Sequence, residues 1–280
     1  MIPKIGGHVS TAGGLVNAIK NAERIGANCI QIFASSSRQW KITWPSKESA
    51  EQFKKAKKEA GIDPVYLHAP YLINLASPAS EHAALSAKTL LEYLELSDYI
   101  GADGVIFHIG SGKELPEDKA FAIVVGHLKN ILKQFKGKSY LVIENAAGGG
   151  AKIGDTLLEI GGIMKRAPSA RLKFCFDTAH YFEAGQIEKY DEEGVKNLAQ
   201  QIKALIGEDK LVALHVNDSK TAFNSHHDRH ENIGRGYIGL KGFESLAKEK
   251  LFRETAWLLE VPGFDNEGPD KENIDLIKAL

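Results

Sequence analysis

The stretch "LKFCFDTAH", residues 172–180, contains the pattern on which the fold prediction rests. Its apolar part is typical of a buried strand, yet it ends in Asp177, and His180 follows three residues later. Burying an unpaired carboxylate or imidazole costs free energy, so something at that strand end must satisfy both groups. A single Asp–His hydrogen bond would be enough. Another explanation is needed if other strands of the chain end in the same way.

Short apolar runs alternate along the chain with longer amphipathic stretches, such as 14–26, 48–61, 81–101 and 118–135. Parallel strands need a helical crossover between them, so this alternation predicts a parallel sheet. Eight such units in 280 residues fit an α/β fold of the (β/α)8 TIM-barrel type better than an open doubly wound sheet. The eight predicted strands are 5–9, 29–33, 65–67, 105–107, 140–143, 172–176, 211–216 and 256–259.

The composition is that of an ordinary globular protein, with 43% hydrophobic and 25% charged residues. No linker-like segment divides the chain, so residues 1–280 are predicted to form a single domain. The first ten residues, "MIPKIGGHVS", lack the apolar segment of a secretory signal. No apolar run approaches the roughly 18 residues of a membrane span. We therefore expect no membrane partner.

Charge and cysteine content limit the partners and the compartment. The net charge is −1, so a nucleic acid would have to be held by a local basic surface. Cys29 and Cys175 lie in apolar runs without Cys-x-x-Cys spacing, which predicts buried free thiols and a cytoplasmic location. No oligomerisation segment is visible, so a monomer is expected.

Seven of the eight predicted strands end in His, Asp or Glu; "IQIFAS" of the second strand is the exception. The carboxyl ends of barrel strands meet at one face, where the sites of such enzymes lie. Imidazoles and carboxylates together suit zinc or manganese, so we predict a metal site at these ends. The residues concerned are His8, His68, His108, Glu144, Asp177 with His180, His215 with Asp218, and Glu260.

A second concentration of polar residues is "NSHHDRHENIGRGYIG", residues 224–239. Asp228 and His230 flank Arg229, so in an extended loop both point to the same side. The stretch could be a plain surface loop, but beside the strand ends it predicts a lid with ligands of its own. The total suggests two or three ions, and clustered divalent ions suit phosphoester cleavage. That argument does not choose the substrate.

Six segments together resemble the endonuclease IV family of apurinic/apyrimidinic endonucleases, over about residues 5–262. They are "GHVSTAGG", "HAPYLINLASP", "VIENAAGGG", "FDTAHYFEAG", "HVNDSK" and "DRHENIGRGYIG". The resemblance implies a (β/α)8 barrel that hydrolyses the phosphodiester on the 5′ side of an abasic site in double-stranded DNA. The products would be a 3′-hydroxyl and a 5′-deoxyribose phosphate, and removal of 3′-blocking groups is a related activity of the family.

The same resemblance implies three Zn²⁺ ions, with Mn²⁺ conceivable at one of the sites. In the family's arrangement the attacking water lies near Glu144 and Glu260, which are therefore the catalytic candidates. His8 would line the site, and Asp218 would support a ligand from outside. The first ion would be held by His68, His108 and Glu144; the second by Glu144, Asp177, His215 and Glu260; the third by His180, Asp228 and His230.

The resemblance also implies DNA contacts by Arg38, Gln39, Tyr71 and Leu72. In the family, side chains of these two segments enter the minor groove beside the extruded abasic sugar. Wedge side chains can replace lost stacking, and a nucleotide without a base costs less to extrude than a paired one. For Tyr71 and Leu72 the alternative is simple anchoring of their loop against the barrel.

Two other classes stay open from the residues alone. The first is a metal-dependent sugar isomerase or epimerase on a similar barrel, which would use one or two metals and carry more carboxylates or a catalytic lysine. The number of histidines and the "DRH" loop disfavour it. The second is a barrel that binds damaged DNA or stores metal without cutting, which a nicking assay would distinguish.

Overall fold

Eight parallel strands form a closed barrel in the order β1, β10, β7, β6, β5, β4, β3, β2. The structure is a computed structural model that describes residues 4–280; residues 1–3 of the predicted domain lie outside it. The predicted (β/α)8 barrel is confirmed. Its strands are β1 (Ile5–His8), β2 (Cys29–Ile32), β3 (Val65–His68), β4 (Gly104–His108), β5 (Tyr140–Glu144), β6 (Leu172–Asp177), β7 (Leu211–His215) and β10 (Ala256–Leu259).

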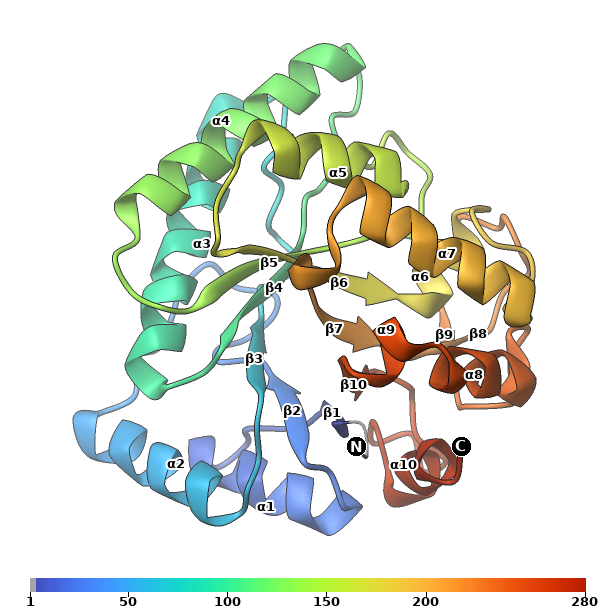
Figure 1. The fold of residues 1–280 in the computed structure, drawn as a ribbon. Helices are drawn as coiled ribbons and strands as arrows, with labels where there is room; N and C mark the ends of the chain where they lie inside the picture. Colours follow the sequence, from blue (N-terminus) through green and yellow to red (C-terminus); the bar gives the residue numbers. More distant parts are fainter. Residues whose placement is uncertain (1–3) are drawn as a thin grey trace.

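Helices form a ring around the barrel, and α10, the last helix, lies beside β1, the first strand (Figure 1). The helices are α1 (Leu15–Ile25), α2 (Lys47–Glu59), α3 (Ser80–Ile100), α4 (Glu117–Gln134), α5 (Leu157–Arg166), α6 (Thr178–Glu183), α7 (Glu192–Leu205), α8 (Gly239–Lys248), α9 (Lys250–Arg253) and α10 (Lys271–Lys278), with a short 3₁₀ turn, η1 (Glu208–Lys210). Two short strands, β8 (Asp218–Ser219) and β9 (His230–Glu231), pair antiparallel beyond the end of β7.

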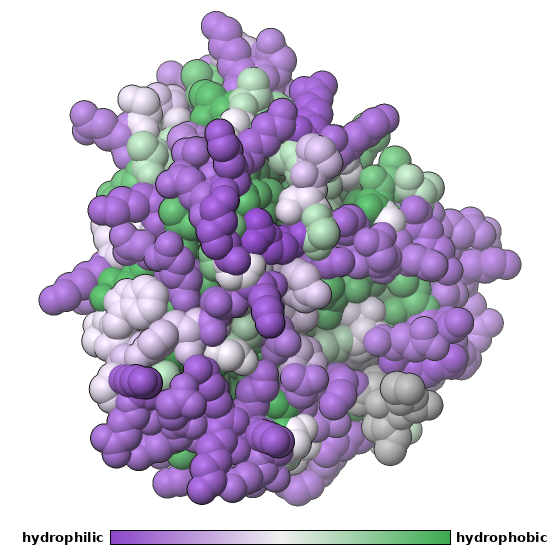
Figure 2. All heavy atoms as spheres, turned by 60° about the vertical axis from the view of Figure 1, so that its left-hand side comes forward, coloured by the Kyte–Doolittle hydropathy of each residue, from purple (hydrophilic) through white to green (hydrophobic). Residues whose placement is uncertain are grey.

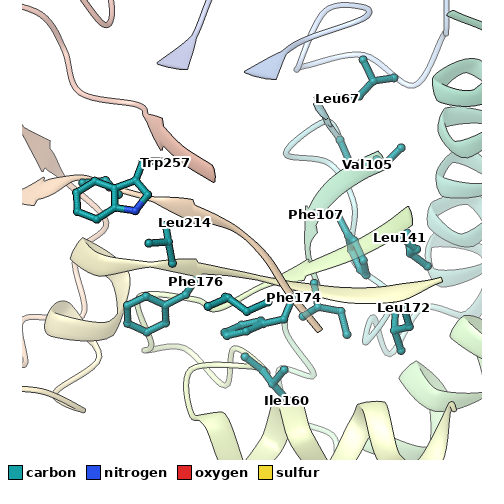
Figure 3. Close-up of a cluster of buried hydrophobic side chains, with 14 of the residues drawn as sticks. Leu67, Val105, Phe107, Leu141, Ile160, Leu172, Phe174, Phe176, Leu214 and Trp257 are labelled. Carbon is teal, nitrogen blue, oxygen red and sulfur yellow. The ribbon is translucent and has the colours of Figure 1, made fainter. Parts of the chain in front are cut away.

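Alternation along each strand separates two cores. On β6, Phe174 and Phe176 pack outward against the helices, while Cys175 belongs to a smaller cluster inside the barrel. Figure 3 shows part of the outer core, in which Phe174 lies close to Ile160 of α5. The inner cluster consists of Cys29, Tyr66, Ile106, Val142, Cys175, Ala213, Ala256 and Leu258.

The outer surface of the helices is largely hydrophilic on the face shown in Figure 2, with apolar side chains visible between the polar ones. This is the pattern of amphipathic helices that bury one face on the sheet. Within residues 4–280, no helix is long and apolar enough to cross a membrane. Cys29 and Cys175 are both free and buried, as predicted.

Candidate metal centre

The last inward-facing position of every barrel strand carries a polar side chain. Each lies two residues beyond a position of the inner cluster or its equivalent, so the side chain points back towards the barrel axis. Because the strands are parallel, their carboxyl ends and these side chains lie at the same end of the barrel. They are His8, Gln31, His68, His108, Glu144, Asp177, His215 and Glu260.

Glu144 connects two groups of candidate ligands. Its Oε2 lies 3.2 Å from Nε2 of His68 and 3.4 Å from Nε2 of His108. Its Oε1 lies 2.7 Å from Nδ1 of His215, which is fully buried, as is Glu144 itself. Glu144 thus faces the first group, His68 and His108, with Oε2, and the second group, around His215, with Oε1.

The second group lies deeper, around His215. Nδ1 of His215 is 3.3 Å from Oε2 of Glu260 and 3.9 Å from Oδ2 of Asp177. Asp177 has a structural task as well, because its Oδ1 accepts a hydrogen bond from the backbone N–H of His180 at the start of α6. That cap fixes the first turn of the helix and with it the position of His180.

The third group contains two imidazoles that face each other. Nε2 of His180 and Nε2 of His230 are 3.3 Å apart, and Oδ1 of Asp228 lies 3.3 Å and 3.6 Å from these two atoms. Oδ2 of Asp177 is 3.9 Å from Nε2 of His230, so this carboxylate also borders the group. Asp228 and His230 thus reach the site from the loop that the sequence singled out.

The outer nitrogens of these two rings show why a cation belongs between them. Nδ1 of His180 lies 3.0 Å from the carbonyl of Asn145, and Nδ1 of His230 lies 3.4 Å from that of Glu260. A carbonyl only accepts, so each Nδ1 carries the proton, and in the neutral rings both Nε2 atoms present lone pairs. Two lone pairs 3.3 Å apart repel each other unless a proton or a metal ion lies between them.

Most spacings in the three groups fit a tetrahedral divalent ion such as zinc; in the second group Nδ1 of His215 lies nearer to Oε1 of Glu144 (2.7 Å) and farther from Oδ2 of Asp177 (3.9 Å). With Zn–N and Zn–O bonds of about 2.0–2.1 Å in a tetrahedron, neighbouring ligand atoms lie about 3.3 Å apart. The contacts of His68 and His108 with Glu144, of His215 with Glu260, and among His180, Asp228 and His230 range from 3.2 to 3.6 Å. The donor set therefore fits divalent ions.

Burial and charge shift the ionisation of the cluster. Burial alone would lower the pKa of His180, but Asp177 and Asp228 raise it well above its usual value. His215 behaves likewise, since Cys175, Glu144 and Glu260 outweigh its burial and raise its pKa. His108 differs, because burial lowers its pKa to about 4. Without ions, protons on His180 and His215 balance part of the carboxylate charge.

The centre opens to the surface through a hollow of about 570 Å³. His68, His108, His180 and His230 form its floor, and Arg229 and the segment 261–269 contribute to its walls. A second hollow of about 440 Å³ adjoins the first, with Tyr71, His108 and Asp228 common to both. An extended substrate could therefore lie across both hollows and reach the centre.

The predicted DNA-contacting residues lie on two neighbouring loops at this opening. Tyr71 is 65% exposed, its ring centre is 5.9 Å from that of His68, and Leu72 lines the second hollow. Arg38 and Gln39 are exposed on the loop that follows β2. The backbone N–H of Tyr71 donates to the carbonyl of Ser37, 3.1 Å away, which ties the two loops together.

Asp218 supports the centre through the backbone. Its two oxygens accept hydrogen bonds from five backbone N–H groups, those of Ser219, Gly234, Gly236, Ile238 and Gly239. The described contacts of its carboxylate are with this backbone and not with a candidate ligand side chain. It fixes the loop that follows His230, and β8 pairs with β9 to place His230 itself. His8, by contrast, contacts the cluster directly, with Nδ1 3.4 Å from Oε1 of Glu260.

Some residues of the centre escaped the sequence analysis. Gln31 is the inward residue of β2, and the alternation from Cys29 could have revealed it, although an amide is not a charged ligand. Asn217 donates to Oδ2 of Asp177 (2.7 Å), and its own Oδ1 accepts from the backbone N–H of Glu260 (2.7 Å). Buried Glu183 accepts from the Ser219 hydroxyl (2.7 Å) and holds the lid loop to α6.

Comparison with known proteins gives one consistent family. The family model described as "Xylose isomerase-like TIM barrel" matches residues 19–280. "Probable endonuclease 4" of Aquifex aeolicus is 36% identical over 276 residues, covering 98% of this chain and 96% of the relative. That of Halothermothrix orenii is 34% identical over 280 residues, covering 98% and 99%. The chain belongs to the endonuclease IV family.

Solved structures agree with this assignment. Endonuclease IV from Thermus thermophilus superposes with a TM-score of 0.85 at 28% identity, covering 99% of this chain and 98% of that one. A 3-keto-D-glucoside 4-epimerase from E. coli superposes with a TM-score of 0.69 at 16% identity, covering 99% and 100%. At so low an identity the epimerase shows the shared barrel alone.

We predict that Asp218→Asn loosens the lid loop. The new amide would point N–H groups at backbone N–H groups, so hydrogen exchange in residues 230–239 should accelerate by about tenfold or more. The affinity for the ion of the third group should fall because His230 is no longer held in position. Exposed Asp209, changed in the same way to Asn, is the control. Unaltered exchange in the Asp218 variant would contradict the anchoring role.

We predict that metal binding weakens as the pH falls. The raised pKa values of His180 and His215 mean that each ion must displace protons from nitrogens that face it. Below these pKa values the protonated rings favour the metal-free state, and above them the competition disappears. Zinc competition titrations between pH 6 and pH 8, corrected for protonation of the chelator, should give log affinity rising by about one or more per pH unit. A flat profile would refute this.

Proposed function

We propose that this chain is a metal-dependent apurinic/apyrimidinic endonuclease. It would hydrolyse the phosphodiester on the 5′ side of an abasic site in double-stranded DNA and leave a 3′-hydroxyl and a 5′-deoxyribose phosphate. The observation that carries the proposal is the three-part donor set at the floor of an open hollow, in a chain of the endonuclease IV family. The same face also carries the loops of Tyr71 and Arg38.

The proposed cofactor is three Zn²⁺ ions, with Mn²⁺ as an alternative at one position. His68, His108 and Glu144 would hold one ion, Glu144, Asp177, His215 and Glu260 the second, and His180, Asp228 and His230 the third. When bound, such ions polarise phosphoryl oxygens, lower the pKa of water and stabilise charge on a leaving oxygen.

The protein's own residues would position the reactants. Facing histidines hold the pKa of Glu144 well below its usual range despite burial, so its two oxygens stay available on both sides. The pKa of Glu260 is also lowered, chiefly by the charge of His215, against the effect of burial. These two carboxylates are the proposed catalytic residues because Glu144 is shared by two ligand groups and Glu260 lines the hollow. Arg229, on the wall, adds positive charge where a phosphate would enter.

We extend the proposal to DNA ends that carry a 3′-blocking group. Incision on the 5′ side of an abasic nucleotide breaks the bond between phosphorus and a 3′ oxygen. Removal of a phosphate-linked fragment from a 3′ end breaks the same bond with the same leaving oxygen. A centre that stabilises that oxygen serves both substrates.

Tyr71 and Leu72 are the proposed wedge, with Arg38 and Gln39 beside them. Tyr71 is 65% exposed, so its ring can stack on a base. Partial burial raises the pKa of its phenol to about 12, so the side chain stays neutral. Base–aromatic stacking contributes about 1–3 kcal/mol per base, which offsets the cost of extruding the abasic nucleotide.

The organisation proposed for the protein is one domain, residues 1–280, acting as a monomer in the cytoplasm. Supporting this, a single closed barrel runs from β1 to β10, and α10 packs back on α1 and β1. The free, buried thiols of Cys29 and Cys175 suit a reducing compartment.

The decisive measurement pairs metal content with incision of a duplex that carries one tetrahydrofuran abasic analogue. We expect about three ions per chain and a single cut on the 5′ side that a chelator abolishes. Glu144→Gln should lower incision by at least about 10³-fold while circular dichroism stays unchanged, because one shared charge is lost and shape is kept. Exposed Glu208, changed to Gln, is the control.

Two results would count against the proposal. Full incision by a Glu144→Gln preparation free of wild-type enzyme would remove Glu144 from the chemistry. Bound metal without incision by the wild-type chain would favour the sugar isomerase or epimerase class, and the next substrates to test would be sugar phosphates.

Arg38→Ala should weaken engagement of the lesion more than the chemical step. We expect the Kd for the abasic duplex to rise by about tenfold, near 1.4 kcal/mol, with single-turnover incision at saturating enzyme changed by less than about threefold. Lys203→Ala, on α7 at the end that leads towards β7, is the matched control for a lost cation. A single-turnover rate that falls as steeply as the affinity would show that Arg38 acts on the chemical step.

A further inference from the structure

Gln31 occupies the one barrel strand whose end carries no charged or imidazole group. It is the last inward residue of β2, is fully buried, and pairs in register with His8 of β1. A buried primary amide must satisfy one acceptor and two donor groups, so an uncommitted glutamine here would cost free energy. Its partners therefore show what it does.

Three side chains surround the amide and use all of its hydrogen-bonding groups. Oε1 accepts from Nε2 of His215 at 2.8 Å. The amide nitrogen donates to Oε1 of Glu260 at 2.6 Å and to Nδ1 of His8 at 3.0 Å. Turning the amide over would place its oxygen 2.6 Å from a carboxylate oxygen, which is repulsive, so the contact with Glu260 fixes its orientation.

That orientation determines which nitrogen of His215 is free. Because Oε1 of Gln31 can only accept, Nε2 of His215 carries a proton, and Nδ1 is the nitrogen that faces Glu144 and Glu260. The other four imidazoles among the candidate ligands, those of His68, His108, His180 and His230, turn Nε2 towards their neighbours instead. The His215 ring is thus oriented the other way round. Its Nε2 is bonded to Gln31, whereas Nε2 of the other four rings faces the centre.

The Gln31 amide also gives the two carboxylate oxygens of Glu260 different contacts. Oε1 is occupied by Gln31, and Oε2 lies 3.3 Å from Nδ1 of His215. A carboxylate restrained through one oxygen presents the other as a single ligand atom. Gln31 thus contacts the side chains of two members of the second ligand group, His215 and Glu260, at once.

We propose that Gln31 is a positioning residue for the second metal position. It selects the Nε2–H tautomer of His215, so that Nδ1 is the ligand atom, and it restricts Glu260 to binding through Oε2. The inference rests on the proposed metal centre and is independent of the DNA substrate. Outer partners of this kind typically change metal affinity by about 10–100-fold when removed.

The test replaces the amide with a side chain of similar length that cannot hydrogen-bond in this way. Gln31→Met should lower the affinity for one zinc ion by about 10–100-fold and leave the other two nearly unchanged in competition titrations. In the ¹¹³Cd-substituted protein, one resonance should shift or broaden. Incision should fall and be restored by raised zinc, a rescue that a general loss of structure would not give.

Tyr66→Phe is the matched control. It removes another buried hydrogen bond inside the barrel, from the Tyr66 hydroxyl to the carbonyl of Val212 (3.3 Å), without touching a candidate ligand. We expect wild-type zinc affinities and ¹¹³Cd shifts for it. If Gln31→Met does not fold, Gln31→Asn keeps the polarity but is too short to reach both partners, and the same loss at one ion is expected.

The outcomes separate this inference from the proposed function. Wild-type zinc affinities and unchanged ¹¹³Cd shifts in the folded Gln31 variant would overturn the positioning role and leave the endonuclease proposal intact. Three bound ions without incision in the wild-type chain would overturn the endonuclease proposal, while the affinities would still decide the role of Gln31. A wild-type chain that holds no zinc would overturn both.

Discussion

The interior of a closed parallel barrel leaves room for only a few layers of side chains, and this constraint organises the molecule. Every strand must place alternate residues towards the axis, so the last inward residues of all eight strands together form the end layer of side chains at one opening of the barrel, staggered between neighbouring strands. Here that layer consists of imidazoles, carboxylates and one amide in place of branched apolar side chains. The cluster of Cys29, Val142, Leu258 and their neighbours beneath it is apolar and keeps water from the far side. Charge is thus concentrated at the open end only.

Such a layer is stabilised when its rings have a second hydrogen-bond partner besides the facing ligand atoms. His68 donates from Nδ1 to the carbonyl of Ala69 (2.7 Å), and His180 and His230 use backbone carbonyls likewise. His215 uses Gln31. His108 is the exception among the described residues, since its Nδ1 is buried without a partner and its pKa is lowered. Orientation therefore comes largely from the backbone, which is why positions one or two residues from the strand ends matter as much as the ligands.

The sequence predicted the barrel and the strand-end cluster because both depend on local patterns. Alternation of strands and helices, and a polar residue after each apolar run, are visible without tertiary information. The strand limits differ by a residue or two; β4, for instance, extends from Gly104 to His108 rather than over 105–107. Gln31 was missed because the polar ends were sought among charged residues and histidines. A supporting role was predicted for Asp218, but its partners could not be foreseen, since four of the five backbone N–H groups that it accepts from lie 16 to 21 residues away in a loop without a regular pattern.

The net charge of the candidate metal centre differs between its metal-free and metal-loaded states, so the same face repels a phosphodiester in the first state and attracts it in the second. The candidate ligands include four carboxylates, Glu144, Asp177, Asp228 and Glu260. Without ions this end of the barrel is acidic, partly offset by protons on His180 and His215, and disfavours a phosphodiester.

Three divalent ions would carry six positive charges, so with neutral histidines the loaded centre would have a net positive charge of about two. Under the proposed function, a chain whose overall charge is −1 would therefore present a local positive site to DNA. Because that field would lie at the floor of the hollow, it would favour a phosphate that reaches inside over one that passes along the surface. In the proposed reaction an extruded abasic nucleotide would bring its phosphate inward in this way, which would link the electrostatics of the centre to recognition of the lesion.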